Sequence, residues 1–86
     1  MTAQLPGYHL TPIIKGQLGE PSKIREELQE LEDAFAQKDR ILMLVELADM
    51  YGAMELFLEK HLPGMTMEDL KKFSHTTRRA FENGRR

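Results

Sequence analysis

Four acidic residues stand at a regular spacing in the middle of the chain. Glu27 and Glu30 are three residues apart, and Glu46 and Asp49 repeat this spacing after fifteen intervening residues. Residues at positions i and i+3 of an α-helix lie about 60° apart on its surface, so both acids of a pair can reach one ion. Carboxylate oxygens suit hard cations, and the sequence contains no cysteine to act as a softer ligand. The spacing therefore predicts a site for Mg²⁺, with Mn²⁺ as an alternative.

The second acid pair interrupts a segment that is otherwise apolar. Of the eighteen residues from 41 to 58, fourteen are apolar, and the charged ones are Glu46, Asp49 and Glu55. A carboxylate on an apolar helix face costs several kcal/mol unless it is paired, neutralised or bound to a cation. Two interpretations stay open: the acids pair with Lys or Arg from a neighbouring helix, or they bind a metal ion. The presence of an acid pair on each of two successive helices favours the metal ion.

Three helices are predicted from their capping residues and apolar spacing. The first should begin at Ser22, an N-cap residue that follows proline, and end near residue 38. The second should run from Asp39 as N-cap to residue 61, and the third from Thr66 as N-cap to residue 82. Antiparallel packing of the first two helices, through a short connection at residues 37–39, would bring both acid pairs to one level of a bundle.

The inward faces of the first and third helices are expected to be apolar stripes. Spacings of three and four residues place one stripe on each helix: Ile24, Leu28, Leu31 and Phe35, then Leu70, Phe73, Thr77 and Phe81. Glu27 and Glu30 lie at the margin of the first stripe. Glu26, Glu32 and Asp33 project further from it, and we expect them to be ordinary solvated acids.

Residues 1–21 are expected to form an extended N-terminal arm ahead of an all-α metal-binding domain at residues 22–86. Glycine and proline recur through the arm and disfavour a helix. Its apolar residues Leu10, Ile13 and Ile14 are expected to pack over the helices. Lys15 is followed by glycine at two nearby positions, which indicates either a surface turn or a loop that approaches a phosphate.

The size of the chain favours self-association. Its 86 residues form one domain, which hides roughly 60–65% of its unfolded surface. The second helix is apolar on all sides, so its burial requires a bundle or a partner chain, and we expect a homo-oligomer. Acids near its middle and charges at its ends argue against a membrane span. Residues 1–7 lack the features of a signal peptide and cysteine is absent, so we expect a cytoplasmic protein.

Charge is distributed unevenly along the sequence. Residues 71–86 carry six basic side chains and one acid, a balance of +5, so the overall charge of −2 leaves −7 on residues 1–70. The basic end is expected to meet an anionic part of the same assembly or a ligand with phosphates. A nucleic acid is a less favoured partner, which salt-sensitive binding to DNA would reveal.

The pattern Glu27-x-x-Glu30 followed by Glu46-x-x-Asp49 resembles the signature of the MazG-like, all-α nucleoside triphosphate pyrophosphohydrolases, a superfamily that includes phosphoribosyl-ATP pyrophosphohydrolase. Residues 23–28 (KIREEL) resemble the start of the family's first motif helix, and residues 46–52 (ELADMYG) resemble its second. Residues 14–20 and 79–86 look like those of short bacterial or phage-type members.

The resemblance implies an all-α helical bundle of three main helices, completed by oligomerisation as a dimer or tetramer because the chain ends soon after the third helix. It also implies Mg²⁺-dependent hydrolysis of a (d)NTP or related nucleotide between the α- and β-phosphates, which gives a nucleoside monophosphate and pyrophosphate. The metal ligands and catalytic residues would be the four acids Glu27, Glu30, Glu46 and Asp49. The substrate phosphates would contact basic residues, for which the candidates are Lys15, Lys23, Lys72, Arg79 and Arg86.

The main alternative is a non-enzymatic helical module that binds a nucleotide or a protein partner. The sequence does not identify the nucleotide. Phe35, Tyr51 and Phe57 are candidate walls of a base pocket, and they are equally candidate core residues.

Overall fold

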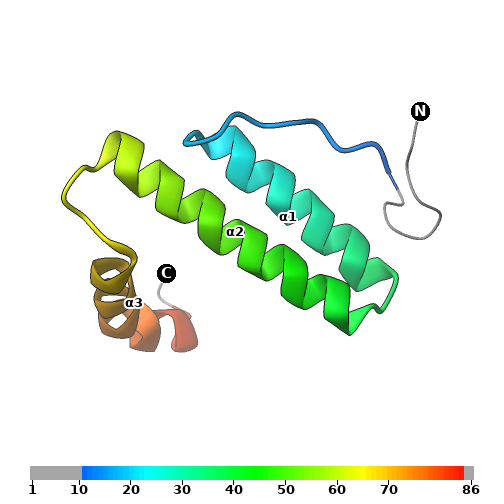
Figure 1. The fold of residues 1–86 in the computed structure, drawn as a ribbon. Helices are drawn as coiled ribbons and strands as arrows, with labels where there is room; N and C mark the ends of the chain where they lie inside the picture. The colour runs from blue at the N-terminus through cyan, green and yellow to red at the C-terminus, as the bar shows by residue number, and fades with distance from the viewer. Residues whose placement is uncertain (1–10, 85–86) are drawn as a thin grey trace.

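The computed structural model describes residues 11–84, and the regular secondary structure within that range is all α-helical. Three helices follow one another along the chain: α1 at Pro21–Ala36, α2 at Arg40–His61 and α3 at Met67–Glu82 (Figure 1). No strand occurs between residues 11 and 84. The predicted all-α class and the number of main helices are confirmed.

The ends of α2 and α3 lie where their capping residues predict them. The Asp39 carboxylate accepts a hydrogen bond from the backbone N–H of Leu42 at 3.0 Å. Thr66 and Asp69 form a reciprocal capping box, in which the Thr66 hydroxyl accepts from the Asp69 N–H and the Asp69 carboxylate accepts from the Thr66 N–H. Each cap satisfies backbone donors that a helix start leaves without an intrahelical partner.

The start and end of α1 differ from the sequence prediction. Glu20 is the N-cap residue, without a side-chain cap, and Pro21 occupies the first turn, where its missing N–H is tolerated. Ser22 lies inside the helix instead, and its hydroxyl accepts a hydrogen bond from the Gln17 N–H at 3.0 Å. The helix ends at Ala36, earlier than predicted, because Lys38 adopts a left-handed backbone conformation with φ of 59° that terminates the turn.

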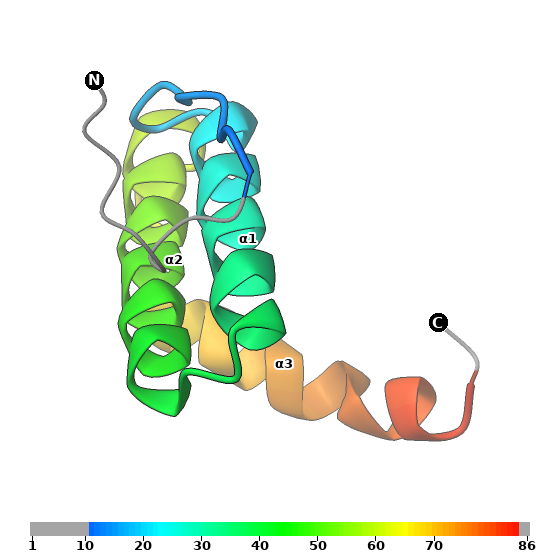
Figure 2. The ribbon, with the colours of Figure 1, turned by 90° about the vertical axis from the view of Figure 1, so that its right-hand side faces the viewer.

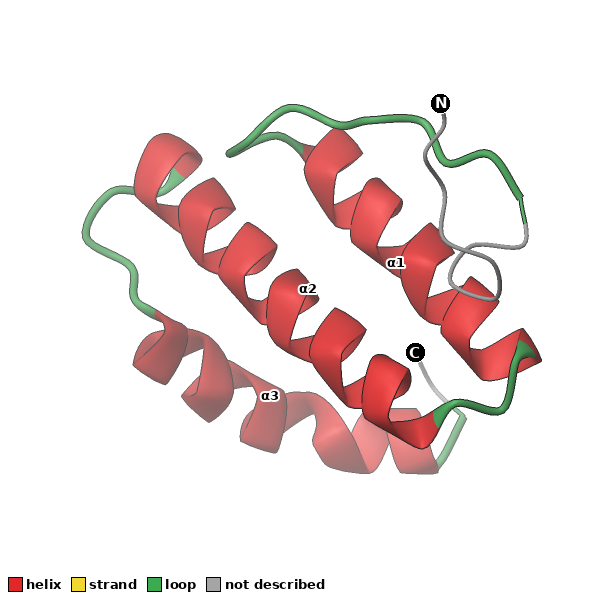
Figure 3. Ribbon diagram, turned by 45° about the vertical axis from the view of Figure 1, so that its right-hand side comes forward, coloured by secondary structure: helices red, strands yellow, loops and turns green. Residues whose placement is uncertain are grey.

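Helices α1 and α2 form an antiparallel hairpin, and within residues 11–84 they are the one pair of helices that packs extensively (Figure 3). Residues 37–39 make the short connection between them. Helix α3 follows the loop after α2, and Figure 2 shows its C-terminal part extending away from the hairpin. The fold therefore consists of a two-helix unit and a third helix that packs against it only loosely.

The face that α1 turns toward α2 is not the predicted apolar stripe. Phe35 is 70% exposed and Leu28 is also exposed, whereas Glu27 and Ala34 are buried. Lys23, Glu27, Glu30 and Ala34 repeat the spacing of the predicted stripe one position earlier, which rotates the inward face by about 100°. The face of α1 that meets α2 therefore carries the acids Glu27 and Glu30 in place of the predicted apolar side chains.

The buried core of the hairpin is small and unusually charged. Its buried apolar side chains are Ala34, Ala53 and Leu58, and its buried acids are Glu26, Glu27, Asp33 and Glu46. Glu26 and Asp33 were predicted to be solvated, and this prediction is wrong, because the chain before α1 folds over both of them. On α2, Ile41, Leu44 and Tyr51 remain exposed, and Tyr51 lines a pocket together with residues of α3. The helices between residues 11 and 84 do not reach the combination of length and hydropathy that a membrane span requires.

Residues 11–20 form a non-helical segment that passes over α1 (Figure 1). The Thr11 N–H donates to the Asp33 carboxylate at 3.3 Å, and the Gly16 N–H donates to Glu26 Oε1 at 2.9 Å. Lys60 and His61, at the end of α2, pair with Glu20 and hold the start of α1. Ile13 is half-buried while Ile14 is exposed, so the predicted packing of Ile14 is wrong, and Leu10 lies outside the described residues.

Gly16 is placed where the segment passes closest to α1, and substitution to alanine tests this contact. A Cβ at residue 16 would lie 2.2 Å from the carbonyl oxygen of Ser22 and 2.5 Å from the Cα of Lys23, so the backbone would have to move. Gly16→Ala should lower the free energy of unfolding by about 1–3 kcal/mol in denaturant titrations. Gln17→Ala, an exposed neighbour, should change it by less than about 0.5 kcal/mol. Equal stability of the two variants would contradict the close approach.

Candidate metal centre

The four acids singled out by their spacing converge between the two helices of the hairpin. Helix α1 contributes Glu27 and Glu30, and α2 contributes Glu46 and Asp49. One carboxylate oxygen of each lies within 4.8 Å of the corresponding oxygens of the other three. The short connection at residues 37–39 sets this register. It reverses the chain so that the acid pair of α1 lies opposite the acid pair of α2.

Burial divides the four carboxylates into an inner and an outer pair. Glu27 and Glu46 are buried, Glu30 is half-buried and Asp49 is exposed. The cluster therefore has a protected floor and one side open to solvent, and a ligand approaching it meets Asp49 first. Exposure on one side only is the arrangement that a metal centre with open coordination positions requires.

The acids raise one another's proton affinity. Burial, a hydrogen bond with Glu46 and the negative charges of Glu27 and Glu46 together raise the pKa of Glu30 to about 8. Burial also raises the pKa of Glu27; Lys23 opposes this effect, and the charge of Asp49 adds to it. The fully ionised cluster is therefore unfavourable without a cation, which is the electrostatic condition for binding one.

Lys23 connects the cluster to a fifth acid. Its Nζ lies 3.1 Å from Glu26 Oε1 and 3.2 Å from Glu27 Oε2. Glu26 is only 2% exposed, and it also accepts the Gly16 N–H and pairs with Lys15 Nζ at 3.5 Å. Burial opposes ionisation of Glu26, but these donors outweigh it and hold its pKa below the ordinary value. Because Lys23 belongs to α1 itself, this contact differs from the pairing considered from sequence, in which Lys or Arg of a neighbouring helix would pair with Glu46 and Asp49.

Glu26 is the important residue that the sequence pattern did not single out. The periodicity of the apolar stripe placed it on the solvated side, and only the fold of residues 11–20 over α1 buries it. A signal was present nonetheless, since Lys23 stands three residues before Glu26 and four before Glu27. Both spacings allow a lysine to reach a glutamate on one helix face.

The arrangement fits a hard divalent cation. All four converging donors are carboxylate oxygens, the ligands that Mg²⁺ and Mn²⁺ prefer. Glu27 Oε1 is buried and has no hydrogen-bond partner among the described residues. A buried carboxylate oxygen without a partner is energetically costly, and a cation bound beside Glu27 Oε1 would supply that partner.

A pocket opens beside the cluster on the side of the arm. Its volume is about 550 Å³, and its charged lining residues are Lys23, Glu27, Asp49 and Glu55. The other lining residues are Leu18 of the arm and Ala48, Gly52, Ala53 and Leu56 of α2. Gly52 lies in the interior of α2, where glycine destabilises a helix by roughly 0.5–1 kcal/mol relative to alanine. Phe35, Tyr51 and Phe57, the predicted candidates for a base pocket, are not part of this wall.

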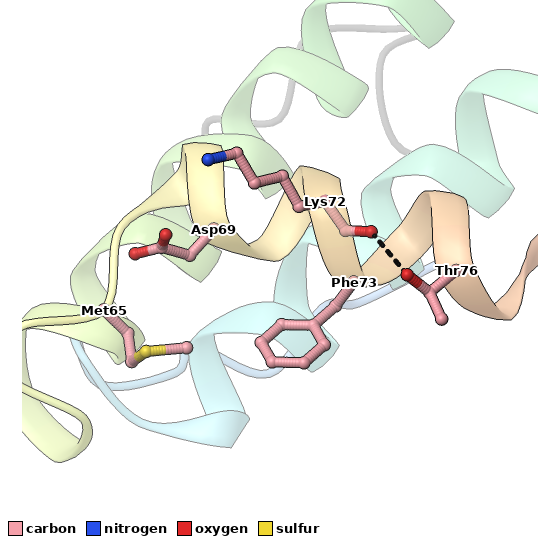
Figure 4. Close-up of a pocket in the computed structure, with 5 residues that line it drawn as sticks. All are labelled: Met65, Asp69, Lys72, Phe73 and Thr76. Carbon is pink, nitrogen blue, oxygen red and sulfur yellow. Dashed lines mark hydrogen bonds between the residues drawn. The ribbon is translucent and has the colours of Figure 1, made fainter.

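The predicted phosphate contacts are divided between the hairpin and α3. Lys15 and Lys23 are joined to the cluster through Glu26, as described above. Lys72 lines a separate pocket on α3 with Met65, Asp69, Phe73 and Thr76, in which the Thr76 hydroxyl donates to the Lys72 carbonyl (Figure 4). Arg79 lies in the last turn of α3, and Arg86 falls outside the described residues. Of these candidates, Lys23 of α1 contacts Glu26 and Glu27, and Lys15, from the segment before α1, contacts Glu26.

Comparison of the chain with models of protein families, with curated proteins and with solved structures finds no match in any of the three.

The raised pKa of Glu30 predicts an unusual dependence of stability on pH. Between the ordinary value of 4.5 and about 8, folded Glu30 keeps a proton that the unfolded chain has lost. The folded state is therefore favoured at the acidic end, and the free energy of unfolding should fall as pH rises from about 5 to about 8.5. The raised pKa of Glu27 acts in the same direction. Thermal unfolding in metal-free buffer across this range measures the effect.

Two controls separate this effect from general charge repulsion. Glu30→Gln should remove most of the pH dependence, and saturating Mg²⁺ should stabilise the wild-type protein most at the alkaline end, where the acids are ionised. Stability of the metal-free protein that rises through this range, or stays flat, would contradict the electrostatics described for the cluster.

Proposed function

We propose that this chain is an Mg²⁺-dependent nucleotide pyrophosphohydrolase, which converts a (d)NTP or related nucleotide to the monophosphate and pyrophosphate. The observation that carries the proposal is the convergence of four carboxylates, two from each helix, with donor oxygens within 4.8 Å of one another. The resemblance of these positions to the MazG-like signature supports the same assignment. The lysines joined to the acids provide positive charge beside the position where phosphates would bind.

The metal would be held by Glu27, Glu30, Glu46 and Asp49, and Mn²⁺ should substitute for Mg²⁺. When bound, the ion would offset the repulsion among the acids and the charge that develops on the phosphate oxygens. Lys23 Nζ, already 3.2 Å from Glu27 Oε2, is placed to bind a phosphate oxygen at the mouth of the pocket. Exposed Lys15 pairs with Glu26, which also binds Lys23, and would add a second cation near the phosphates.

The reaction needs one water molecule and a group that accepts its proton. The water oxygen adds to phosphorus, the bridging bond between the α- and β-phosphates breaks, and the products are the monophosphate and pyrophosphate. A carboxylate of the cluster would orient the water and accept the proton that it releases. The buried floor formed by Glu27 and Glu46 limits access of bulk water to that side.

The protein is proposed to work as a homo-oligomer, either a dimer or a tetramer. Ile41, Leu44 and Tyr51 recur at three and seven residues on α2 and are 76%, 69% and 52% exposed. Leu28 and Phe35 of the apolar stripe on α1 are exposed as well. A second copy that covers these surfaces would supply the apolar burial that a two-helix unit with three buried apolar side chains lacks.

Sedimentation equilibrium tests the proposed assembly. The wild-type protein should sediment as a dimer or tetramer at micromolar concentration, and Leu44→Glu should shift it toward the monomer, because a carboxylate in an apolar interface is costly. Leu62→Glu changes an exposed leucine beyond the end of α2 and should leave the assembly intact. A wild-type protein that remains monomeric would contradict the assembly.

A non-enzymatic helical module is the alternative function, and the exposed apolar residues of α2 and α3 favour it. Leu70, Phe73 and Phe81 are exposed on α3 together with the pocket that contains Lys72 (Figure 4). Such a surface suits a protein partner. This alternative predicts nucleotide or protein binding without turnover.

Incubation with individual nucleotides and Mg²⁺ tests the proposed function. Release of pyrophosphate and monophosphate from at least one (d)NTP is expected, and Glu46→Gln should lower turnover by roughly 100-fold or more, since it removes a charged ligand. The variant should fold, because the amide relieves repulsion in the cluster.

Glu59→Gln alters an exposed acid of α2 outside the cluster and should retain activity. Unchanged turnover in Glu46→Gln would contradict the assigned site, and no turnover by the wild type would contradict the function.

A further inference from the structure

Glu26 is a buried acid to which the proposed reaction assigns no role. It is 2% exposed, and it stands next to Glu27 of the four-acid cluster. A buried carboxylate is costly unless donors surround it, and both oxygens of Glu26 have them. Its Oε1 accepts from the Gly16 N–H at 2.9 Å and from Lys23 Nζ at 3.1 Å, and its Oε2 pairs with Lys15 Nζ at 3.5 Å. The chain thus places two lysines and a backbone donor around an acid outside the cluster.

Lys23 stands between Glu26 and the cluster. Its Nζ lies 3.1 Å from Glu26 Oε1 and 3.2 Å from Glu27 Oε2, so one ammonium group serves both acids. Burial opposes the charge of Lys23, whose side chain is 22% exposed, but the two carboxylates outweigh burial and raise the pKa of Lys23 above its ordinary value. Lys23 is therefore a fixed positive charge in direct contact with a proposed metal ligand.

A divalent cation at Glu27 would compete with Lys23 for the same carboxylate. The cation and the ammonium group repel each other, and this repulsion is stronger where little water screens it. If Glu27 were the sole partner of Lys23, cation binding would leave a half-buried ammonium group without a counter-charge, which is costly. Glu26 reduces that cost, because Lys23 keeps a second carboxylate at 3.1 Å when Glu27 turns to the cation.

We propose that Lys23 is the counter-ion of Glu27 in the metal-free protein, and that Glu26 is a positioning residue that retains Lys23 when a divalent cation replaces it at Glu27. The inference rests on the proposed binding of a cation by the four acids and extends it, because it assigns the two residues that control how readily the cation enters. The segment before α1 takes part, since Gly16 and Lys15 supply the other donors that hold Glu26 in place.

Glu26 also has a direct route to the cluster, through Glu30. A hydrogen bond with Glu26 is one of the contacts that raise the pKa of Glu30, after burial and the contacts with Glu46 and Glu27. Substitution of Glu26 can therefore change cation binding directly as well as through Lys23. A double-mutant cycle separates the two routes, because an effect that acts through Lys23 disappears once Lys23 is replaced.

Titration calorimetry with Mn²⁺ alone, in the absence of nucleotide, measures this cycle. Lys23→Met removes the competing charge and should tighten Mn²⁺ binding by about fivefold or more. Glu26→Gln keeps an acceptor for the Gly16 N–H but loses the charge that retains Lys23, so it should weaken binding by about fivefold or more. In the Lys23→Met background, Glu26→Gln should change the Mn²⁺ dissociation constant by less than about twofold. Arg25→Met removes an exposed cation of α1 and should also change it by less than about twofold.

Crystals of the wild-type protein with Mn²⁺ give a second measurement that needs no substitution, and it decides the question where a variant does not fold. Lys23 Nζ should remain within hydrogen-bonding distance of Glu26 and lie beyond that distance from Glu27.

Three results overturn the inference and leave the metal site and the pyrophosphohydrolase intact. They are an unchanged Mn²⁺ affinity in Lys23→Met, a weakening by Glu26→Gln that persists in the Lys23→Met background, and a Lys23 that still pairs with Glu27 beside a bound ion. Absence of Mn²⁺ binding by the wild type overturns the inference together with the metal site on which it rests.

Discussion

Repulsion among carboxylates enclosed between two helices is the constraint on which the structure of this protein depends. Glu27, Glu30, Glu46 and Asp49 face one another across the hairpin, and two of them are buried. The raised pKa of Glu30 reflects the energetic cost of ionising a carboxyl group that is partly buried beside other acids. A hairpin interior would ordinarily be apolar, so acids placed there favour the proposed binding of a cation.

Contacts around the cluster reduce the repulsion among the acids without removing it. Lys23 forms ion pairs with both Glu26 and Glu27. Glu26 also accepts a hydrogen bond from the Gly16 N–H and pairs with Lys15. The segment before α1 is therefore part of the site, since it supplies donors to the acid that holds Lys23. Because the acids take the inward face of α1, Leu28 and Phe35 of its apolar stripe remain exposed, and another copy of the chain is proposed to cover them.

Sequence reasoning identified the helices and the four acids because each depends on local signals. Asp39 and Thr66 are caps that act within one turn, and the i, i+3 spacing places both members of an acid pair on one face. The rotation of α1 was not predicted because apolar periodicity indicates which residues favour burial, and not which face of a helix meets the neighbouring helix. Glu26 was missed because its burial depends on Gly16, a contact between residues ten positions apart. The pocket at Gly52 likewise depends on three segments meeting, which no local pattern encodes.

Anomalous diffraction from crystals containing Mn²⁺ would show whether the four carboxylates bind a divalent cation. We expect an anomalous peak between α1 and α2, with oxygens of Glu27, Glu30, Glu46 and Asp49 around it, in direct contact at about 2.0–2.3 Å or bridged by water. Peaks found only elsewhere on the protein, or an empty cluster at saturating Mn²⁺ and alkaline pH, would contradict it.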